Sequence, residues 1–258
     1  MRSLVPLFLL LSACAKGQPA KAEESFCHQQ NFEGSRFTVC DNKGGDLTLF
    51  AAGKNERPIR SFTDLMRKLD VRHVAFAMNA GMFDEEGRPI GYAARNGTIF
   101  HKVNLKDGPG NFHLKPNGVF IVNCGGTRAM VLPSDAIPEF RCAPRLITQS
   151  GPMLVIDGKL HPKLHADGSS RLTRNGVGVT AQGKPLFVIS ESAVSLGKFA
   201  RFFRDGLKTP NALYFDGSVS SLWDPADGRQ DSYSELGPII VAFKPEASKP
   251  GRGAPSKP

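Results

Sequence analysis

Several common catalytic motifs are missing from this sequence of 258 residues. It contains no Gly-x-x-x-x-Gly-Lys-Ser/Thr phosphate loop and no Gly-x-Gly-x-x-Gly dinucleotide fingerprint. It also lacks the His-Glu-x-x-His pattern of zinc proteases and the Gly-x-Ser-x-Gly turn of serine esterases. The sequence therefore gives no support to ordinary nucleotide-binding, zinc-protease or serine-esterase functions.

Runs of basic residues with interleaved aromatic residues are also missing, although the formal net charge is +9. Such runs are what would indicate a nucleic-acid interface, so we expect no nucleic-acid partner. A basic excess of this size is compatible with an anionic substrate, but it is equally typical of a solvated surface. The sequence does not indicate the oligomeric state.

Long hydrophobic runs are absent, and the apolar run near the N-terminus, Leu4 to Leu11, is too short to span a bilayer. It follows Arg2 and reads as a secretory signal, and the stretch "LSAC" matches the lipobox of bacterial lipoproteins. Residues 1–14 are then a signal peptide with lipobox. Cys14 becomes the lipidated first residue, which anchors the protein to the periplasmic face of a bacterial membrane. The alternative is ordinary cleavage after Ala15, which would release a soluble periplasmic protein.

Composition divides the rest of the chain into three parts. Residues 15–25 are small and polar and form a predicted tether. Residues 245–258 are basic and rich in Pro, Gly and Ser, which predicts a disordered tail. Residues 26–244 contain no linker and no repeat, so we expect a single domain.

Cysteine is scarce, with five residues in the chain and no Cys-x-x-Cys spacing that would favour a zinc site. Without Cys14, four cysteines remain, an even number in an oxidising compartment, and they allow three disulfide pairings. We favour the neighbour pairing, which closes the two short loops Cys27–Cys40 and Cys124–Cys142. Each such disulfide contributes roughly 3 kcal/mol in the chain-entropy model.

Most of the predicted domain has the patterns of β-strands. Hairpins are expected at "DNKGG" (41–45), between strands 36–40 and 46–51, and at the Asn96-Gly97 and Asp157-Gly158 pairs. The nearly continuous apolar run 71–81 predicts a strand buried on both faces. Two helices are expected, one after Ser61 and one in "SLGKFARFFRDGL" (195–207). The fold class is therefore α+β, a strand-rich mixed sheet core with a few flanking helices.

The Asp-Gly pair at Asp216 has two interpretations. It follows a good strand, as a hairpin turn would, but the segment after it, "SVSS", is small and polar and does not alternate like a strand. Gly217 permits close approach of a ligand to the backbone, and Ser218 supplies a donor beside the carboxylate. The dipeptide occurs six times in the chain, so it is a weak signal by itself.

Other stretches place polar residues next to predicted strands. Each also has an ordinary structural explanation, as a turn, a loop or a surface charge. His161 and His165 are four residues apart, but Pro162 between them favours a loop, so we expect no metal site. The remaining candidates are Asn79 and Gly81 in "MNAGMF", Asn117 in "GNFHLKPNGVF", Gln149, Ser150 and Gly151 in "TQSGPMLV", and Arg174 and Asn175 in "RNGVGV".

Together and in order, these stretches resemble the phosphodiester glycosidase family, and most closely its bacterial exported branch. The family pattern has an Asn-Gly-Gly-Phe-Phe turn, an Arg-x-x-x-Gly strand start and an Asp-Gly-Gly-Gly-Ser turn. Here these look like "NAGMF" (79–83), "RNGVG" (174–178) and "DGSVSS" (216–221). Ala80, Ser218 and Val219 stand where the family has glycine. The resemblance covers roughly residues 36 to 243.

The resemblance implies hydrolysis of the sugar C1–O bond in a sugar-1-phosphodiester, with a phosphorylated glycan as substrate and no cofactor. Asp216 would be the carboxylate that faces the developing oxocarbenium ion, and Arg174 would hold the phosphate. Asn79 completes the expected catalytic set. The expected substrate-binding residues are Gly81, Asn117, Gln149, Ser150, Gly151, Asn175, Gly217 and Ser218.

Two other functions stay open at this stage. One is a non-catalytic lipoprotein that binds an anionic glycan with the same residues. The other is a phosphodiesterase that cuts the P–O bond instead of the C–O bond.

Overall fold

The protein is described by a computed structural model that covers residues 25–245. The predicted signal peptide with Cys14, the tether before residue 25 and the tail from residue 246 lie outside the described residues. No helix among the described residues is long and apolar enough to cross a membrane.

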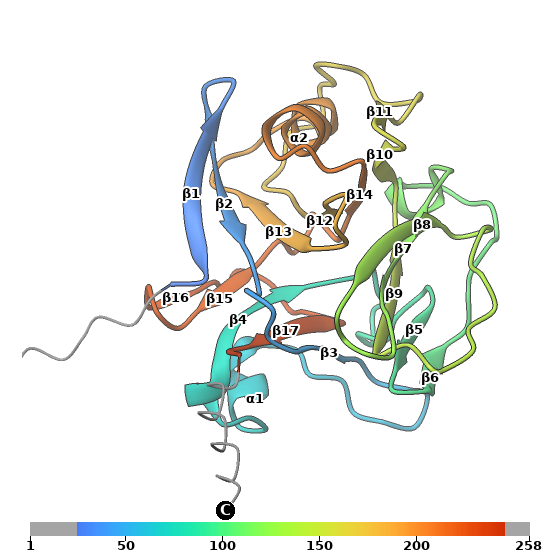
Figure 1. The fold of residues 1–258 in the computed structure, drawn as a ribbon, viewed down its shortest axis with the longest axis vertical. Helices are drawn as coiled ribbons and strands as arrows, with labels where there is room; N and C mark the ends of the chain where they lie inside the picture. The colour runs from blue at the N-terminus through green and yellow to red at the C-terminus, as the bar shows by residue number, and fades with distance from the viewer. Residues whose placement is uncertain (1–24, 246–258) are drawn as a thin grey trace, which may run out of the picture.

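Three sheets build the domain (Figure 1). The largest has seven strands in the order β1 (Cys27–Phe32), β2 (Ser35–Cys40), β13 (Pro185–Ser190), β12 (Asn175–Val179), β14 (Asn211–Tyr214), β10 (Met153–Ile156) and β11 (Lys159–Leu160). The second has the order β16 (Arg229–Gln230), β15 (Leu222–Asp224), β4 (Val74–Asn79), β17 (Ile239–Phe243) and β3 (Leu47–Phe50). The third has the order β6 (Thr98–His101), β5 (Ala93–Arg95), β9 (Leu146–Ser150), β7 (Gly118–Val122) and β8 (Ala129–Pro133).

The strand-rich α+β prediction is confirmed, but the sheets are not mixed. Every pairing between the named strands in residues 25–245 is antiparallel. Parallel neighbours need long crossover connections, which are usually helical. The described chain has only two α-helices, of five and six residues, so it has little helix from which to build such crossovers.

Both predicted helices are present, and the first begins at its predicted cap. The Ser61 side chain accepts a hydrogen bond from the Asp64 amide at the start of α1 (Phe62–Met66). Ser195 caps α2 (Leu196–Arg201) in the same way, and a π-helical turn, Phe202–Gly206, continues it. Two 3₁₀ turns, Val71–His73 and Asn111–His113, complete the helical elements.

The hairpin predictions had mixed outcomes. Asn96-Gly97 joins β5 to β6, and Asp157-Gly158 joins β10 to β11; all four of these residues have positive φ, between 46° and 84°. The hairpin predicted at 41–45 is wrong, because β2 and β3 belong to different sheets. The partner of β2 is β1, and the 41–45 segment instead carries the chain from one sheet to the next.

The hydrophobic core lies where the three sheets meet. Phe187 of β13 contacts Phe76 of β4 and Phe120 of β7, one aromatic ring from each sheet, with ring centroids 5.4 and 5.6 Å apart. α2 covers the other face of the seven-stranded sheet through Phe199, which lies near Phe37. The three sheets are therefore packed into one body around a shared aromatic centre.

The predicted disulfide pairing is confirmed. Cys27 is bonded to Cys40 across the β1–β2 pair, and Cys124 is bonded to Cys142 near the surface. The first disulfide is buried against the main core, whereas both cysteines of the second are exposed.

Candidate active site

Asp216 is not the turn of a hairpin. β14 ends at Tyr214 in the seven-stranded sheet, and the next strand, β15, belongs to the second sheet. Residues 215–221, which we call the crossing loop, therefore connect two sheets. In this respect Asp216 differs from Asp157, which is an ordinary hairpin-turn residue.

Two buried asparagine side chains hold the backbone of the crossing loop. Asn79, at the end of β4, donates from Nδ2 to the Asp216 carbonyl at 3.0 Å, and its Oδ1 accepts from the Ser221 amide at 2.8 Å. Asn175, at the start of β12, donates from Nδ2 to the Asn79 carbonyl and to Asn79 Oδ1 at 2.8 and 2.9 Å. Asn79, Asn175 and Asp216 were all predicted to belong to one site, and the structure places them together. Both amide side chains bond protein atoms and fix the loop.

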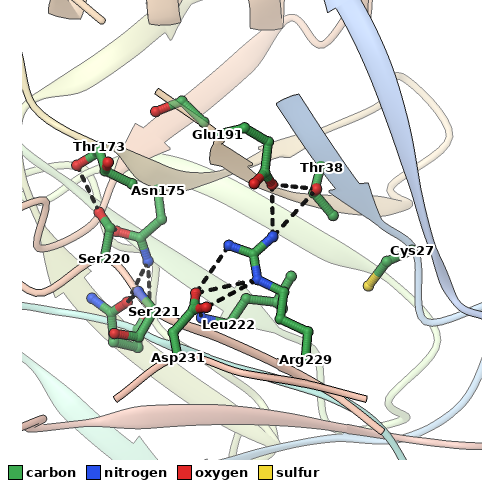
Figure 2. A network of polar contacts seen from close by, with 12 residues as sticks. Cys27, Thr38, Thr173, Asn175, Glu191, Ser220, Ser221, Leu222, Arg229 and Asp231 are labelled. Carbon is green, nitrogen blue, oxygen red and sulfur yellow. Dashed lines mark hydrogen bonds and ion pairs between the residues drawn. The ribbon is translucent and has the colours of Figure 1, made fainter. Parts of the chain in front are cut away.

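Ser220 ties the same loop to the seven-stranded sheet (Figure 2). Its hydroxyl lies 3.1 Å from Asn175 Oδ1 and 3.0 Å from the Thr173 carbonyl. Strand ends from two sheets thus converge on residues 215–221, and buried polar groups that are all hydrogen-bonded make the loop rigid.

Arg174 lies beneath the crossing loop with its guanidinium buried. It donates to the Val194 carbonyl from Nε, to the Tyr214 hydroxyl from Nη1 and to the Ser170 carbonyl from Nη2, at 2.8, 2.8 and 2.9 Å. Arg174 was expected to hold a phosphate directly, but here these donors face acceptors of the protein.

The Tyr214 hydroxyl links Arg174 to the crossing loop. A Cβ added at Gly217 would lie 1.6 Å from this oxygen, so only glycine fits where the loop passes over the tyrosine. Arg174 and Gly217 therefore both approach the Tyr214 hydroxyl, and the Arg174 guanidinium also stacks over the Tyr214 ring.

The Asp216 carboxyl group is largely removed from solvent. Burial raises its pKa above the usual value, while hydrogen bonds from the Ser218 backbone and side chain oppose the shift. The Ser218 amide donates to Asp216 Oδ1 at 3.0 Å, and Ser218 itself is exposed. Raised carboxyl pKa values are common at catalytic sites, which favours a chemical role for Asp216.

Gly81 lies next to Asp216, because the Asp216 amide donates to the carbonyl of Ala80 at 3.2 Å. The Gly81 amide donates to Thr148 Oγ1 at 3.3 Å, and a Cβ at Gly81 would lie 2.3 Å from the Gln149 carbonyl. Gly81 therefore permits close packing of this turn against β9.

The other predicted site residues lie where β7 begins and β9 ends. Gln149 is buried, and its Nε2 donates to the Asn104 carbonyl and to Ser134 Oγ, at 2.7 and 2.9 Å. These two bonds hold a surface loop against β9. Asn117 donates to the Phe112 carbonyl at 2.8 Å and packs against Gly151. These contacts give Gln149 and Asn117 structural partners in the protein.

Ser150 differs from its neighbours. It is completely buried, and its hydroxyl has no hydrogen-bond partner among the described residues. The Gly151–Pro152 peptide bond that follows it is cis. A buried hydroxyl without a hydrogen-bond partner costs free energy of folding. Ser150 therefore carries a polar group in β9 that the protein itself does not satisfy.

An open cavity of about 440 Å³ borders the crossing loop, and sequence patterns did not indicate most of its lining. Gly217, Ser218 and Ser220 line it together with Glu191, Arg229 and Asp231, among others. Arg229 and Asp231 are two residues apart, which places them on one face of an extended segment, but this spacing is too common to mark a site.

Arg229 lies between two carboxylates on the cavity floor (Figure 2). It donates from Nη1 to Glu191 Oε1 at 2.6 Å and from Nη2 to Asp231 Oδ2 at 2.9 Å. Burial lowers the pKa of Arg229, but its bonds to Asp231 and Glu191 outweigh this, so the net shift is upward. Within residues 25–245, no group of three or more His, Cys, Asp or Glu side chains is arranged to hold a metal ion.

Comparison with known proteins decides the family. A family model described as phosphodiester glycosidase matches residues 72–231, more than half of the chain. The chain belongs to the phosphodiester glycosidase family. The resemblance found in the sequence is thereby confirmed, and this is a family of hydrolases that act on phosphodiester glycosides.

Individual proteins share sequence or fold with the chain. The chain is 35% identical over 150 residues to the uncharacterized protein YigE of Escherichia coli strain K12, a match that spans 58% of each protein. Its fold is similar to the zebrafish N-acetylglucosamine-1-phosphodiester alpha-N-acetylglucosaminidase catalytic domain auto-inhibited by pro-peptide, with a TM-score of 0.57 and 17% identity over 90% of this chain and 87% of that one. A hypothetical protein from Synechocystis matches with a TM-score of 0.52 and 18% identity, over 84% of this chain and 61% of that one.

Proposed function

We propose that this phosphodiester glycosidase is an exported enzyme that hydrolyses the sugar C1–O bond of a sugar-1-phosphodiester in a cell-envelope or extracellular glycan. The observation that carries the proposal is Asp216, a carboxyl group with a raised pKa on a loop that two buried asparagines hold beside an open cavity. Membership of the family supports the reaction class.

The chemistry needs only one carboxylate. As the C1–O bond breaks, its electron pair leaves with the phosphate monoester, a good leaving group that does not need protonation. Ionised Asp216 faces the positive charge at C1 and acts in one of two ways. As a nucleophile it bonds to C1, and water then attacks C1, breaks the C1–Asp216 bond and releases the carboxylate. As a base it accepts a proton from the water that attacks C1 directly. In both routes water supplies the hydroxyl group at C1, and its proton passes to solvent.

The surrounding residues take different roles in this proposal. Exposed Ser218 binds a sugar hydroxyl or the phosphate, whereas Ser150 is completely buried and lines neither this cavity nor the adjoining one. Arg174 acts as a positioning residue, because it reaches Gly217 only through the Tyr214 hydroxyl. Asn79 and Asn175 hold the Asp216 backbone in place.

Replacement of Asp216 tests the proposal. Asp216→Asn keeps the shape of the side chain but removes its negative charge, so kcat on a sugar-1-phosphodiester should fall by roughly 10²–10³-fold. Asp157→Asn is the matched control, because it changes an exposed Asp-Gly pair in a hairpin and should leave kcat unchanged. Full activity of Asp216→Asn would refute the assignment.

Hydrolysis in water labelled with heavy oxygen separates C–O from P–O cleavage. Label in the released sugar supports the glycosidase, whereas label in the phosphate identifies a phosphodiesterase. Stoichiometric binding without turnover would identify a glycan-binding protein.

We propose further that the protein is a lipoprotein on the periplasmic face of a bacterial membrane, anchored through Cys14. The "LSAC" stretch supports this, and two disulfides agree with an oxidising compartment. In a bacterial host, the full chain should incorporate labelled palmitate and sediment with membranes, and Cys14→Ser should abolish both. A soluble wild-type protein without label would support cleavage after Ala15.

A further inference from the structure

A second cavity continues the one beside the crossing loop. It has a volume of about 400 Å³ and runs toward β1, with Cys27, His28 and Gln29 in its lining. The two cavities adjoin, because they share four lining residues: Glu191, Arg229, Asp231 and Tyr233. We call the second cavity, between these shared residues and β1, the groove.

The shared floor of the groove is polar and rigid. Arg229 ties Glu191 to Asp231, and Asp231 Oδ2 also accepts from the Leu222 amide at 3.0 Å. Glu191 Oε1 accepts from both Arg229 and Thr38, whereas Oε2 has no hydrogen-bond partner among residues 25–245. A carboxylate that is held by one oxygen presents its other oxygen to a ligand donor, such as a sugar hydroxyl.

An aromatic ring stands on the rim above this floor. Tyr233 is 86% exposed, the highest exposure among the large hydrophobic residues that the structure describes. It lines both cavities, so it lies where they meet. An exposed aromatic face beside hydroxyl-accepting groups suits the apolar face of a sugar ring, because aromatic side chains combine apolar area with few rotatable bonds.

The charge of the groove argues against a phosphate in it. Its lining has four carboxylates and one guanidinium, although the whole chain has a net charge of +9. The carboxylates are Glu191, Asp224, Asp227 and Asp231, and the guanidinium is Arg229. Excess negative charge repels an anion, so the groove favours neutral, hydroxyl-rich groups.

We propose that this groove is a subsite for a neutral sugar residue beyond the bond that is cut, with Tyr233 as its stacking platform and Glu191 as its hydroxyl acceptor. The inference rests on the proposed glycosidase function and narrows it. The substrate is then an oligosaccharide or polymer that carries the phosphodiester, because a single sugar phosphodiester would leave the groove empty.

Binding of neutral sugars tests the groove separately from catalysis. The probes are trisaccharides of glucose, of mannose and of N-acetylglucosamine, each compared with its monosaccharide, and Kd is measured on the full chain by calorimetric titration. At least one trisaccharide should bind about tenfold or more tightly than its monosaccharide. Tyr233→Ala should weaken that binding by about tenfold, the size of one aromatic contact.

Two further variants make the result specific. Glu191→Gln keeps the shape of the side chain but removes the anionic acceptor, so it should also weaken trisaccharide binding. Phe140→Ala changes another exposed aromatic residue outside the groove and should leave Kd unchanged. If no trisaccharide binds, or if Tyr233→Ala binds like wild type, the groove proposal is overturned.

The Asp216→Asn variant separates this proposal from the proposed function. It should lose turnover of a sugar-1-phosphodiester but bind the trisaccharide as wild type does. If the wild type turns over substrate but its trisaccharide binding does not depend on Tyr233, the groove proposal is refuted and the glycosidase function stands. Tyr233-dependent binding without any turnover refutes the glycosidase function and leaves a glycan-binding groove.

Discussion

At the scale of single residues, environment rather than residue type separates Asp216 from the other aspartates that precede glycine. Asp157 is an exposed turn residue with positive φ, whereas Asp216 is largely buried and its Oδ1 accepts from the Ser218 amide. Burial raises the pKa of the Asp216 carboxyl group. The chemistry proposed here depends on that difference.

The pH dependence of kcat/KM should report the raised pKa of Asp216. The reacting form is ionised, so activity is present above the pKa and is lost as the pH falls through it. Because burial raises the pKa, the midpoint of the acid limb should lie above the usual aspartate value of 3.8. A pH–rate profile on a sugar-1-phosphodiester measures this midpoint.

Removal of the Ser218 hydroxyl should move that midpoint further upward. The hydroxyl lowers the Asp216 pKa by a hydrogen bond, so Ser218→Ala should shift the acid limb to higher pH. A wild-type midpoint at or below 3.8, or a downward shift in Ser218→Ala, would contradict the role given to Asp216.

The sequence predicted some of these residues well and others poorly. Asn79, Asn175 and Asp216 were identified because each follows or begins a strand in a recognisable block, and the structure brings them together. Arg229 was missed, because its importance comes from Glu191, which is 38 residues away along the chain. Spacing along the chain does not reveal such a contact.

At the scale of elements, the crossing loop depends on one close approach. Gly217→Ala would place a Cβ 1.6 Å from the Tyr214 hydroxyl, so the loop must shift and carry Asp216 with it. We expect a loss of kcat of about 10²-fold, as for other misplacements of about 1 Å near reacting groups. Steady-state kinetics measures the loss.

Gly168→Ala is the matched control for this prediction. A Cβ at Gly168 meets no atom closer than 3.9 Å, so activity should be unchanged. Wild-type kcat in Gly217→Ala would show that the approach of Arg174 and Gly217 to the Tyr214 hydroxyl does not position the carboxylate.

Local turn chemistry also explains which elements could be predicted. Asn96-Gly97 and Asp157-Gly158 each join strands that pair with each other, so the information lies within a few residues. The segment 41–45 looks similar but joins strands of different sheets, because β3 pairs with β17 from the end of the domain. That pairing depends on contacts about 190 residues apart, for which a local pattern gives no signal.

At the scale of the whole molecule, the two disulfides should contribute unequally to stability. Both close short loops, so loss of either costs roughly 3 kcal/mol in chain entropy. The double variant Cys27→Ala/Cys40→Ala also removes buried sulfur from the main core, whereas Cys124 and Cys142 are exposed. It should therefore lower Tm more than Cys124→Ala/Cys142→Ala does.

Thermal unfolding of both double variants, followed by circular dichroism in the same buffer, checks this order. An equal or reversed order would show that burial of Cys27 and Cys40 adds no stability beyond loop closure.

The crossing loop has a consequence for when activity first arises during folding. Its anchors come from β4 in one sheet and β12 in another, so neither sheet alone holds Asp216 in place. Docking of the two sheets around Phe76 and Phe187 must come before the loop is fixed. A newly made chain is then inert toward glycans until its tertiary structure is complete, and activity serves as a readout of the finished fold.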